Sequence, residues 1–285
     1  MSIYNQFFNL ASTCWNIDLL MKENNLFYDC FGQLSDEEWE QILIKSLKEE
    51  NINNVFFPRF PPSDYQKRMH SSDDTKTIHD SMAFYKFIKK NTNLNNENIY
   101  KSNKTLLDFG CGWGRMTRPF LRDFKLKNIH AYEPASDFCT AARILNPYIN
   151  IFNGDFLPPC IFQPNSYDLI ISYSIFTHLT ESYLHAWLHE LARITKPNGT
   201  IVLTFFGDRF LKYFLSQHPD FNESLEKFAK DGFLWRGSHT TFYGLAFMSL
   251  NYIVTTVEKI TPNLKIHTVN KTGEYEQDIL VLRKI

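Results

Sequence analysis

Residues 105–115 read Thr-Leu-Leu-Asp-Phe-Gly-Cys-Gly-Trp-Gly-Arg, and this stretch decides the fold. Its first half is a short apolar run that contains Asp108, and its second half holds Gly110, Gly112 and Gly114. Glycine lacks Cβ, so such a turn can adopt positive φ and let its backbone approach a ligand closely. The stretch therefore predicts a strand, a tight turn and then a helix whose free N–H groups face a nucleotide.

The spacing of these glycines distinguishes two kinds of nucleotide site. The dinucleotide fingerprint is G-x-G-x-x-G, whereas this chain has G-x-G-x-G. A second apolar run, residues 128–133, ends in Glu133 and is followed by Pro134, where a helix is expected to open. A carboxylate at such a strand end can accept hydrogen bonds from both ribose hydroxyls. The two segments together predict an α/β crossover with a nucleoside at its edge.

Two further segments extend the pattern. Residues 148–156 are expected to form a strand that ends in Gly-Asp-Phe, and residues 166–179 a buried parallel strand followed by a polar and aromatic edge. A helix is expected at 181–195, and the turn Lys-Pro-Asn-Gly-Thr at 196–200 leads into a strand at 201–206. Strands that alternate with helices form a parallel sheet, so their carboxyl ends should share one edge.

This combination resembles the class I S-adenosylmethionine-dependent methyltransferases, most strongly over residues 104–206. The glycine stretch is similar to the first motif of that family, and the turn at 196–200 is frequent in it. The resemblance implies a Rossmann-like, doubly wound α/β fold with a seven-stranded, mostly parallel sheet whose last strand is antiparallel. It also implies S-adenosylmethionine as the methyl donor, S-adenosylhomocysteine as the product, and no metal ion.

The resemblance further implies which residues bind the cofactor. In the family, an Asp after the third strand accepts from the adenine amino group and the next apolar residue covers the ring. Asp155 and Phe156 match these two positions, and Tyr173 falls on the same predicted edge. The implied cofactor-binding residues are Asp108, Gly110, Cys111, Gly112, Gly114, Glu133, Pro134, Asp155, Phe156 and Tyr173.

The chain outside the resemblance divides into an extension and an insertion. Residues 1–100 are expected to form a helical extension and linker, with a capping box at 35–38, an extended proline-rich connector at 57–62 and a helix from 75 to 89. Residues 101–285 are the predicted core. Within it, an aromatic-rich insertion spans 207–240, and we expect the extension and this insertion to form a lid over the substrate.

The end of the core is expected to hold three further elements. The sequence predicts a helix near 241–250, a strand near 252–259 and a last strand at 277–282. The two strands would form the antiparallel pair that closes the sheet.

The composition of the chain disfavours nucleic acid, a metal ion and a membrane as partners. With 30 basic and 31 acidic side chains the net charge is −1, which gives no electrostatic footprint for nucleic acid. The five cysteines contain no C-x-x-C pair, and His185 and His189 are best explained as a solvated helix face, so no metal is expected. No run of 18 apolar residues appears and the first basic residue is Lys22, so we expect a cytoplasmic protein without a membrane span.

For the oligomeric state, a homodimer is one candidate assembly.

Whether the enzyme needs a general base depends on the chemical group that accepts the methyl. Methyl transfer needs a proton acceptor when the nucleophile is a hydroxyl, and His178 is the first candidate because it follows the fourth strand. A packed histidine or a helix N-cap is the structural alternative. His239 and Tyr243, which flank the insertion, are the second candidates.

The predicted function is methyl transfer from S-adenosylmethionine to a hydroxyl of a small molecule or glycan. The alternatives are N-methylation of an amine or peptide, and a non-catalytic module that uses the same fold for binding. The glycine spacing disfavours a nicotinamide-dependent oxidoreductase. Ser-Tyr-Ser-Ile at 172–175 replaces the [D/N/S]-P-P-[Y/F] motif of enzymes that methylate amino groups of bases, which disfavours nucleic acid again.

Overall fold

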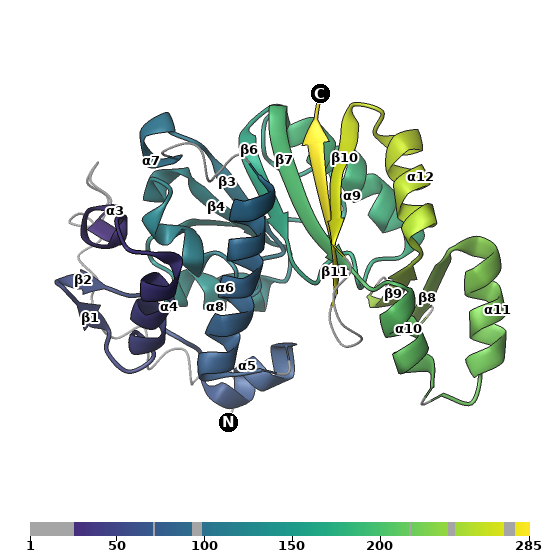
Figure 1. The fold of residues 1–285 in the computed structure, drawn as a ribbon, viewed down its shortest axis with the longest axis horizontal. Helices are drawn as coiled ribbons and strands as arrows, with labels where there is room; N and C mark the ends of the chain where they lie inside the picture. The colour runs from purple at the N-terminus through teal and green to yellow at the C-terminus, as the bar shows by residue number, and fades with distance from the viewer. Residues whose placement is uncertain (1–25, 71, 93–98, 217, 239–242, 271–276) are drawn as a thin grey trace. The chain divides into compact units, whose positions relative to one another are not determined.

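The computed structural model describes residues 26–70, 72–92, 99–216, 218–238, 243–270 and 277–285 (Figure 1). Seven strands form one sheet in the order β10-β11-β7-β6-β3-β4-β5. The strands late in the chain, β10 and β11, are antiparallel to their neighbours. The predicted α/β, Rossmann-like class is thereby confirmed. The chain divides into two compact units, Met1–Gly154 and Asp155–Ile285.

The first unit holds three parallel strands. They pair in register from Leu106 opposite Ile129 and from His130 opposite Asn150. Every residue of the first strand is buried, as expected for a parallel strand covered on both faces. The strands and the helix between the second and third are β3 Leu106–Phe109, β4 Ile129–Glu133, α8 Ser136–Leu145 and β5 Asn150–Asn153.

The segment after the glycine turn corrects one prediction. In place of an α-helix, the described residues form turns and two short 3₁₀-helices, η2 Arg118–Arg122 and η3 Leu126–Asn128. Three glycines at positive φ do not continue into right-handed helix, and Pro119 removes a backbone donor where an α-helix would need one. The helix N-terminus expected to face the nucleotide is therefore not formed by this segment.

Ahead of the glycine turn, the described residues of the predicted extension are mainly helical, and its residues 1–25 and 93–98 lie outside the description. The capping box is confirmed: Glu38 N donates to Ser35 Oγ at 3.1 Å and Ser35 N donates to Glu38 Oε2 at 2.8 Å. The predicted helix at 75–89 is α6, and the connector at 57–62 has no regular structure. The elements are α3 Leu26–Phe31, α4 Asp36–Lys45, β1 Asn51–Ile52, β2 Val55–Phe56, α5 Ser63–His70, α6 Asp74–Asn91 and α7 Ile99–Ser102.

Buried contacts attach this extension to the glycine-turn segment within the first unit. Phe27, Phe31, Trp39 and Phe57 form an aromatic cluster that is almost fully buried. The Trp39 indole donates to the carbonyl of Pro119 at 2.9 Å. The extension is thus part of the core of this unit.

The second unit holds the remaining four strands of the sheet. β6 Tyr167–Ser172 runs parallel to β7 Thr195–Phe205, and α9 Glu181–Ile194 connects them, close to the predicted helix. The turn at 196–199 bulges from β7, because the register moves from Tyr167 opposite Thr195 to Leu169 opposite Thr200. β11 Asp278–Lys284 and β10 Leu264–Asn270 complete this part of the sheet.

The region after β7 corrects two further predictions. The segment expected to be a helix near 241–250 contains the strand β9, and the segment expected to be a strand near 252–259 is the helix α12. The run of β-branched residues at 253–257 suggested a strand, but Ser249 caps a helix by accepting from Tyr252 N at 3.1 Å. The elements are α10 Asp208–Leu215, α11 Phe221–Asp231, β8 Phe233–Gly237, β9 Gly244–Met248 and α12 Leu250–Ile260.

The apolar side chains of the insertion mostly fill a small core of their own. Its buried members come from the end of β7, from α10 and α11 and from the β8–β9 hairpin. They are Phe206, Leu211, Leu215, Phe228, Leu234 and Phe247. Few aromatic rings of the insertion remain exposed, the clearest being Tyr213.

Candidate functional site

The glycine turn follows β3 directly and is held by the neighbouring strand β4. Gly110 N and Cys111 N both donate to the carbonyl of Tyr132, at 2.8 and 3.2 Å. Gly110, Gly112 and Gly114 have φ of 76°, 55° and 89°, a region that glycine adopts at no steric cost. The backbone of the turn therefore favours glycine at all three positions.

Two of these glycines have different surroundings. A Cβ added to Gly112 would find Met69 Cε at 3.8 Å, an ordinary contact, so this side of the turn leaves room for a ligand. A Cβ added to Gly114 would lie 2.6 Å from the Asn146 amide nitrogen, which itself donates to the carbonyl of Trp113 at 2.7 Å. Gly114 thus serves packing, while Gly112 is suited to close approach of a ligand.

Glu133 lies at the end of β4, where the sequence places a ribose-binding carboxylate. Its two oxygens accept from the backbone N–H groups of Gly112, at 2.9 Å, and of Ala135, at 3.0 Å. Burial raises the pKa of Glu133, and these two hydrogen bonds oppose that rise. Each carboxylate oxygen has a second lone pair, so Glu133 can both fix the turn and accept from a ligand. Its contact with ribose stays a prediction.

Asp108 and Cys111 are buried beneath the turn. Asp108 accepts from the Thr117 hydroxyl at 2.5 Å, and burial raises the pKa of its carboxyl to about 7. Burial also raises the pKa of the Cys111 thiol well above its usual value, so this thiol is not an activated nucleophile. Pro134 begins the connection to α8. Both buried side chains are suited to supporting the turn.

Sequence reasoning missed the residues of α5 that border the turn. Trp113 is buried against Tyr65, and its indole donates to His70 Nε2 at 3.2 Å. The charge of Glu133 contributes, after burial, to raising the pKa of Tyr65 to about 12. The signal available in the sequence was the aromatic residue between two glycines of the turn, which needs a partner to bury it.

The remaining predicted cofactor residues lie in the second unit. Asp155 and Phe156 are exposed, and the carbonyl of Phe156 accepts from the Trp187 indole at 2.9 Å. Tyr173 is half-buried after β6. The next residue, Ser174, has φ of 62° and donates its N–H to Thr204 Oγ1 at 2.7 Å, which fixes the end of this strand.

His178 is held by the β8–β9 hairpin of the same unit. Its Nδ1 lies 2.7 Å from the carbonyl oxygen of Gly244, and its ring stacks on Tyr243 with centroids 4.4 Å apart. A carbonyl can only accept, so Nδ1 carries the proton and Nε2 carries a lone pair. Burial lowers the pKa of His178, which favours this neutral form. His239 lies outside the described residues.

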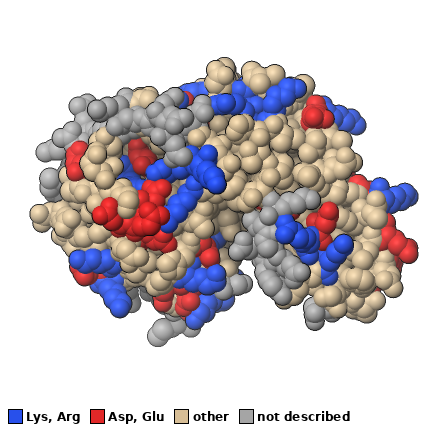
Figure 2. All heavy atoms as spheres, viewed as in Figure 1, with Lys and Arg blue, Asp and Glu red and all other residues tan. Residues whose placement is uncertain are grey.

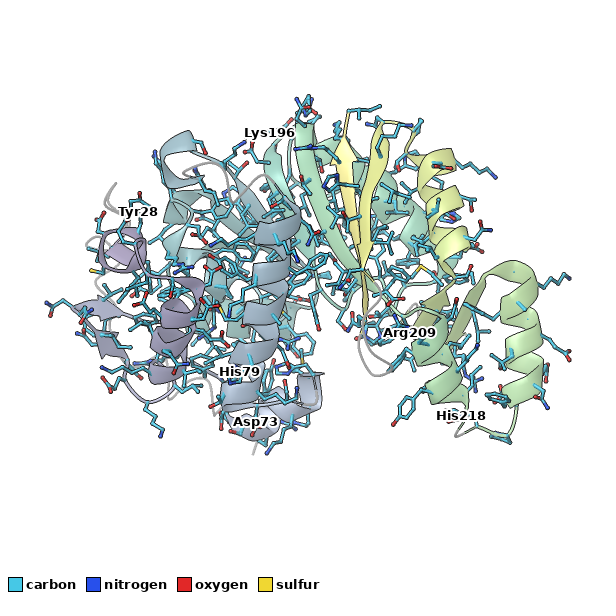
Figure 3. The ribbon with its side chains drawn as sticks, viewed as in Figure 1. Tyr28, Asp73, His79, Lys196, Arg209 and His218 are labelled. Atoms are coloured by element: carbon cyan, nitrogen blue, oxygen red, sulfur yellow. The ribbon has the colours of Figure 1, made fainter. Side chains whose placement is uncertain are left out.

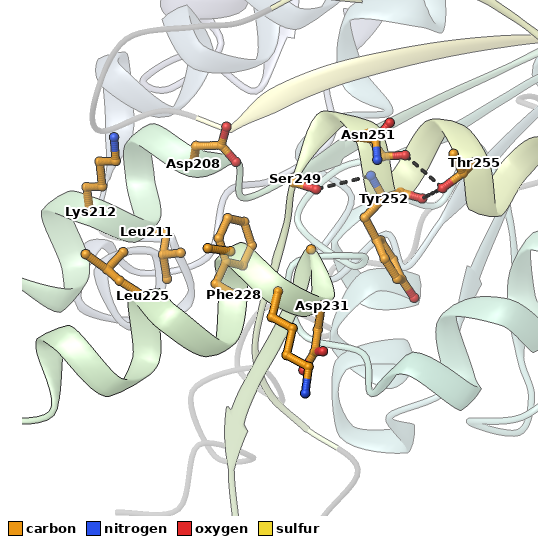
Figure 4. Close-up of a pocket in the computed structure, with 13 residues that line it drawn as sticks. Asp208, Leu211, Lys212, Leu225, Phe228, Asp231, Ser249, Asn251, Tyr252 and Thr255 are labelled. Atoms are coloured by element: carbon orange, nitrogen blue, oxygen red, sulfur yellow. Dashed lines mark hydrogen bonds between the residues drawn. The ribbon is translucent and has the colours of Figure 1, made fainter.

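A cavity of about 590 Å³, shown in Figure 4, lies between the insertion and the start of α12. Leu211, Leu225 and Phe228 supply apolar side chains from α10 and α11, and Ser249 and Tyr252 line it from the start of α12. Within the described chain, the buried Oδ1 of Asp208, another lining residue, has no hydrogen-bond partner.

The side-chain groups and helix lengths of the described residues bear on a metal site and on a membrane span. No group of three or more His, Cys, Asp or Glu side chains there could hold a metal ion. Among the helices of the described segments, none has the length and apolar character needed to cross a bilayer.

A glycine turn held by a strand-end carboxylate, on a seven-stranded α/β sheet, defines a nucleotide-binding protein of the Rossmann-like class. Comparison with known proteins shows which kind of nucleotide-binding protein part of this chain resembles. Residues 106–199 match the family described as "Methyltransferase domain". These residues therefore form a methyltransferase domain, as the resemblance to the class I S-adenosylmethionine-dependent methyltransferases implies.

Two relatives show the extent of the likeness. An uncharacterized methyltransferase of Bacillus mycoides is 31% identical over 115 residues, which cover 39% of this chain and 52% of that protein. A malonyl-[acyl-carrier protein] O-methyltransferase of Halalkalibacterium halodurans is 28% identical over 114 residues, covering 36% of this chain and 40% of that protein. The chain thus spans about half or less of the length of these relatives.

Solved structures agree on the fold. The magnesium protoporphyrin IX methyltransferase of Synechocystis, solved with S-adenosylhomocysteine, has a TM-score of 0.51 at 13% identity. That comparison covers 78% of this chain and 94% of the other. An S-adenosylmethionine-dependent methyltransferase of Clostridium acetobutylicum has a TM-score of 0.50 at 16% identity, covering 78% and 96%.

Proposed function

We propose that the protein transfers a methyl group from S-adenosylmethionine to a hydroxyl group of a small molecule or glycan. The match of residues 106–199 to the methyltransferase domain family supports the reaction class. The observation that carries the choice of a hydroxyl is the state of His178, whose Nδ1–H is fixed by the Gly244 carbonyl so that Nε2 is a base. One of the relatives acts, by its name, as an O-methyltransferase.

The proposed donor site is built on the glycine turn. Gly112 would admit the donor to close backbone contact, and Glu133 would accept from its ribose while it holds the turn. Asp155 and Phe156 would contact the adenine. When bound, S-adenosylmethionine supplies a methyl group on a positively charged sulfur, and the product is S-adenosylhomocysteine.

The chain's own part in the chemistry is then positioning and proton transfer. Holding nucleophile and methyl carbon in line is worth about 7–11 kcal/mol in favourable cases. His178 Nε2 would take the proton of the acceptor hydroxyl, while Nδ1–H stays bonded to Gly244 and stabilises the imidazolium. The insertion at 207–240 and the extension are the proposed lid. Most of the insertion's aromatic rings are half-buried and Phe228 is buried, so acceptor contacts would fall first to exposed side chains such as Tyr213 and Tyr243.

Ligand-dependent melting tests the donor. S-adenosylhomocysteine at about 100 times its Kd should add about 2.7 kcal/mol of stability and raise Tm by about 5–10 °C. NAD at the same concentration should leave Tm unchanged. A rise with NAD alone, or no rise with either nucleoside ligand, would refute the proposed donor.

Substitution of the base tests the mechanism. His178→Ala should lower kcat about 10²–10⁴-fold, measured by release of S-adenosylhomocysteine with a pool of hydroxylated and amine acceptors. The Kd for S-adenosylhomocysteine should stay unchanged. His267→Ala, on the exposed side of β10, is the matched control. Equal rates for both variants would remove His178 from the mechanism and favour an amine acceptor, which needs no base.

A further inference from the structure

The indole of Trp113 joins the glycine turn to the extension. Trp113 lies between Gly112 and Gly114, and only 2% of its surface is exposed. Its Nε1–H donates to His70 Nε2 at 3.2 Å, and its ring meets that of Phe60 edge-on with centroids 5.9 Å apart. Both partners precede the first strand of the sheet by more than thirty residues in the sequence.

The hydrogen bond from Trp113 belongs to a chain of polar contacts. Because His70 Nε2 accepts from the indole, the ring proton must be on Nδ1, which lies 3.0 Å from Ser72 Oγ. Ser72 donates in turn to Asp80 Oδ2 at 3.1 Å. Burial, assisted by the charge of Arg115, lowers the pKa of His70 to about 3, so the accepting form persists near neutral pH.

Arg118 holds the other neighbours of Trp113. Its guanidinium lies 4.1 Å from the ring centre of Phe60 and 4.8 Å from that of Trp113. It donates to the carbonyls of Pro58, at 2.8 Å, and of Arg59. The connector and α5 therefore contact Trp113 from several directions within one unit.

These contacts matter because glycines have no side chains with which to fix themselves. Each glycine loses more backbone freedom on ordering than any other residue, and a turn ordered before binding avoids that cost when the ligand arrives. Glu133 holds Gly112 from the strand side through its N–H. The indole of Trp113 is the next anchor along the turn.

We infer that His70 is a positioning residue of the donor site: acting through Trp113, it holds the glycine turn in the form that binds S-adenosylmethionine. The extension is then part of the donor-binding machinery, in addition to any role over the acceptor. This inference rests on the proposed function, since it concerns affinity for that donor.

Three variants of the full chain test it by calorimetry with S-adenosylhomocysteine. His70→Phe keeps a planar ring but removes the acceptor, and should raise Kd about tenfold. His70→Gln offers an amide oxygen to the indole and should stay within about threefold of the wild type. His79→Phe is the matched control, because His79, labelled in Figure 3, lies on α6 and contacts Glu40 at 2.5 Å.

A spectroscopic measurement separates positioning from general destabilisation. The indole N–H resonance of Trp113, assigned by its loss in Trp113→Phe, should shift in His70→Phe and return toward its wild-type position in His70→Gln. Equal Kd values for wild type and His70→Phe overturn the inference. So does an equal weakening in His79→Phe, or a failure of His70→Gln to restore affinity.

Failure of the wild type to bind the ligand and failure of the variant to fold have different meanings. If the wild type itself does not bind S-adenosylhomocysteine, the proposed function fails and this inference falls with it. If His70→Phe does not fold, Ser72→Ala takes its place, because it releases Nδ1 without touching Trp113. It should raise Kd about threefold, and an unchanged Kd overturns the inference.

Discussion

At the scale of single residues, two buried carboxylates lie beneath the glycine turn and perform different tasks. Glu133 accepts from two backbone N–H groups and orients the turn. Asp108, which belongs to β3 and has 1% of its surface exposed, accepts a hydrogen bond from the Thr117 hydroxyl. Asp108 is thus a supporting residue whose burial is costly when it is ionised.

The stability of the protein should therefore depend on the ionisation of Asp108. Its pKa is about 7 in the folded chain and close to 3.9 when unfolded, so the folded state binds more protons between these values. The stabilisation is complete below about pH 4 and is lost as the pH rises through 7, by about 4 kcal/mol in all. Relative to Asp108→Asn, the wild type should lose stability over this window in urea titrations. Asp64→Asn, at an exposed position, should follow the wild type, and parallel curves for all three would contradict the assignment.

The pH profile of the reaction should report His178. Burial lowers the pKa of this imidazole below its usual 6.5, so Nε2 stays a base into mildly acidic solution. We expect kcat/KM for a hydroxyl acceptor to fall only below pH 6.5 as the pH decreases. His178→Gln should lack this limb at a much lower rate. An acid limb centred above 6.5 in the wild type would assign the base elsewhere.

At the scale of elements, the sequence predicted what depends on local pattern. The capping box at Ser35, the helix α9 and the strands β3, β4 and β6 follow from caps, periodicity and apolar runs. The segments β9 and α12 were exchanged, because β-branched residues at 253–257 favour a strand locally. Burial of Ile253, Thr256 and Val257 along one helical face outweighs that preference.

The candidate site was predictable for similar reasons. The glycines and Glu133 are close in sequence to the strands that position them, so their spacing reveals them. His70 and Tyr65 are not, since they reach the turn only through the packing of α5 on Trp113. No local sequence pattern in residues 63–70 predicts that contact.

The attachment of the extension makes an element-scale prediction. Arg122, with 2% of its surface exposed, donates to the carbonyls of Leu34 and Ser35 at 2.8 and 3.0 Å and also pairs with Asp36. Arg122→Leu would remove these hydrogen bonds of a buried guanidinium to partly exposed acceptors, so the free energy of unfolding should fall by about 1–3 kcal/mol. Urea unfolding measures the loss.

The control for this prediction is a surface arginine of the same extension. The Arg68 side chain is 57% exposed and lies 3.6 Å from Asp64 on the preceding turn of α5. Arg68→Leu should cost less than about 0.5 kcal/mol. Similar losses in both variants would mean that the extension is not held to the glycine-turn segment through Arg122.

At the scale of the whole molecule, the candidate roles are divided between the two units. The first carries the glycine turn with Glu133, and the second carries His178 with the insertion. On the face drawn in Figure 2, basic and acidic side chains lie in small, mixed groups, in keeping with the net charge of −1. This balance of charge does not favour a polyanionic acceptor.

This division predicts where the donor protects the backbone. S-adenosylhomocysteine at about 100 times its Kd should slow exchange of amides that open locally by up to about 100-fold in residues 106–114 and 129–135. Amides of the β8–β9 hairpin at 233–237 and 244–248 should change only when an acceptor is added as well. Hydrogen–deuterium exchange followed by mass spectrometry resolves these peptides, with NAD as the control ligand. Protection confined to the hairpin would contradict a donor site at the glycine turn, because amides at a bound ligand's own site should be the most strongly protected against local opening.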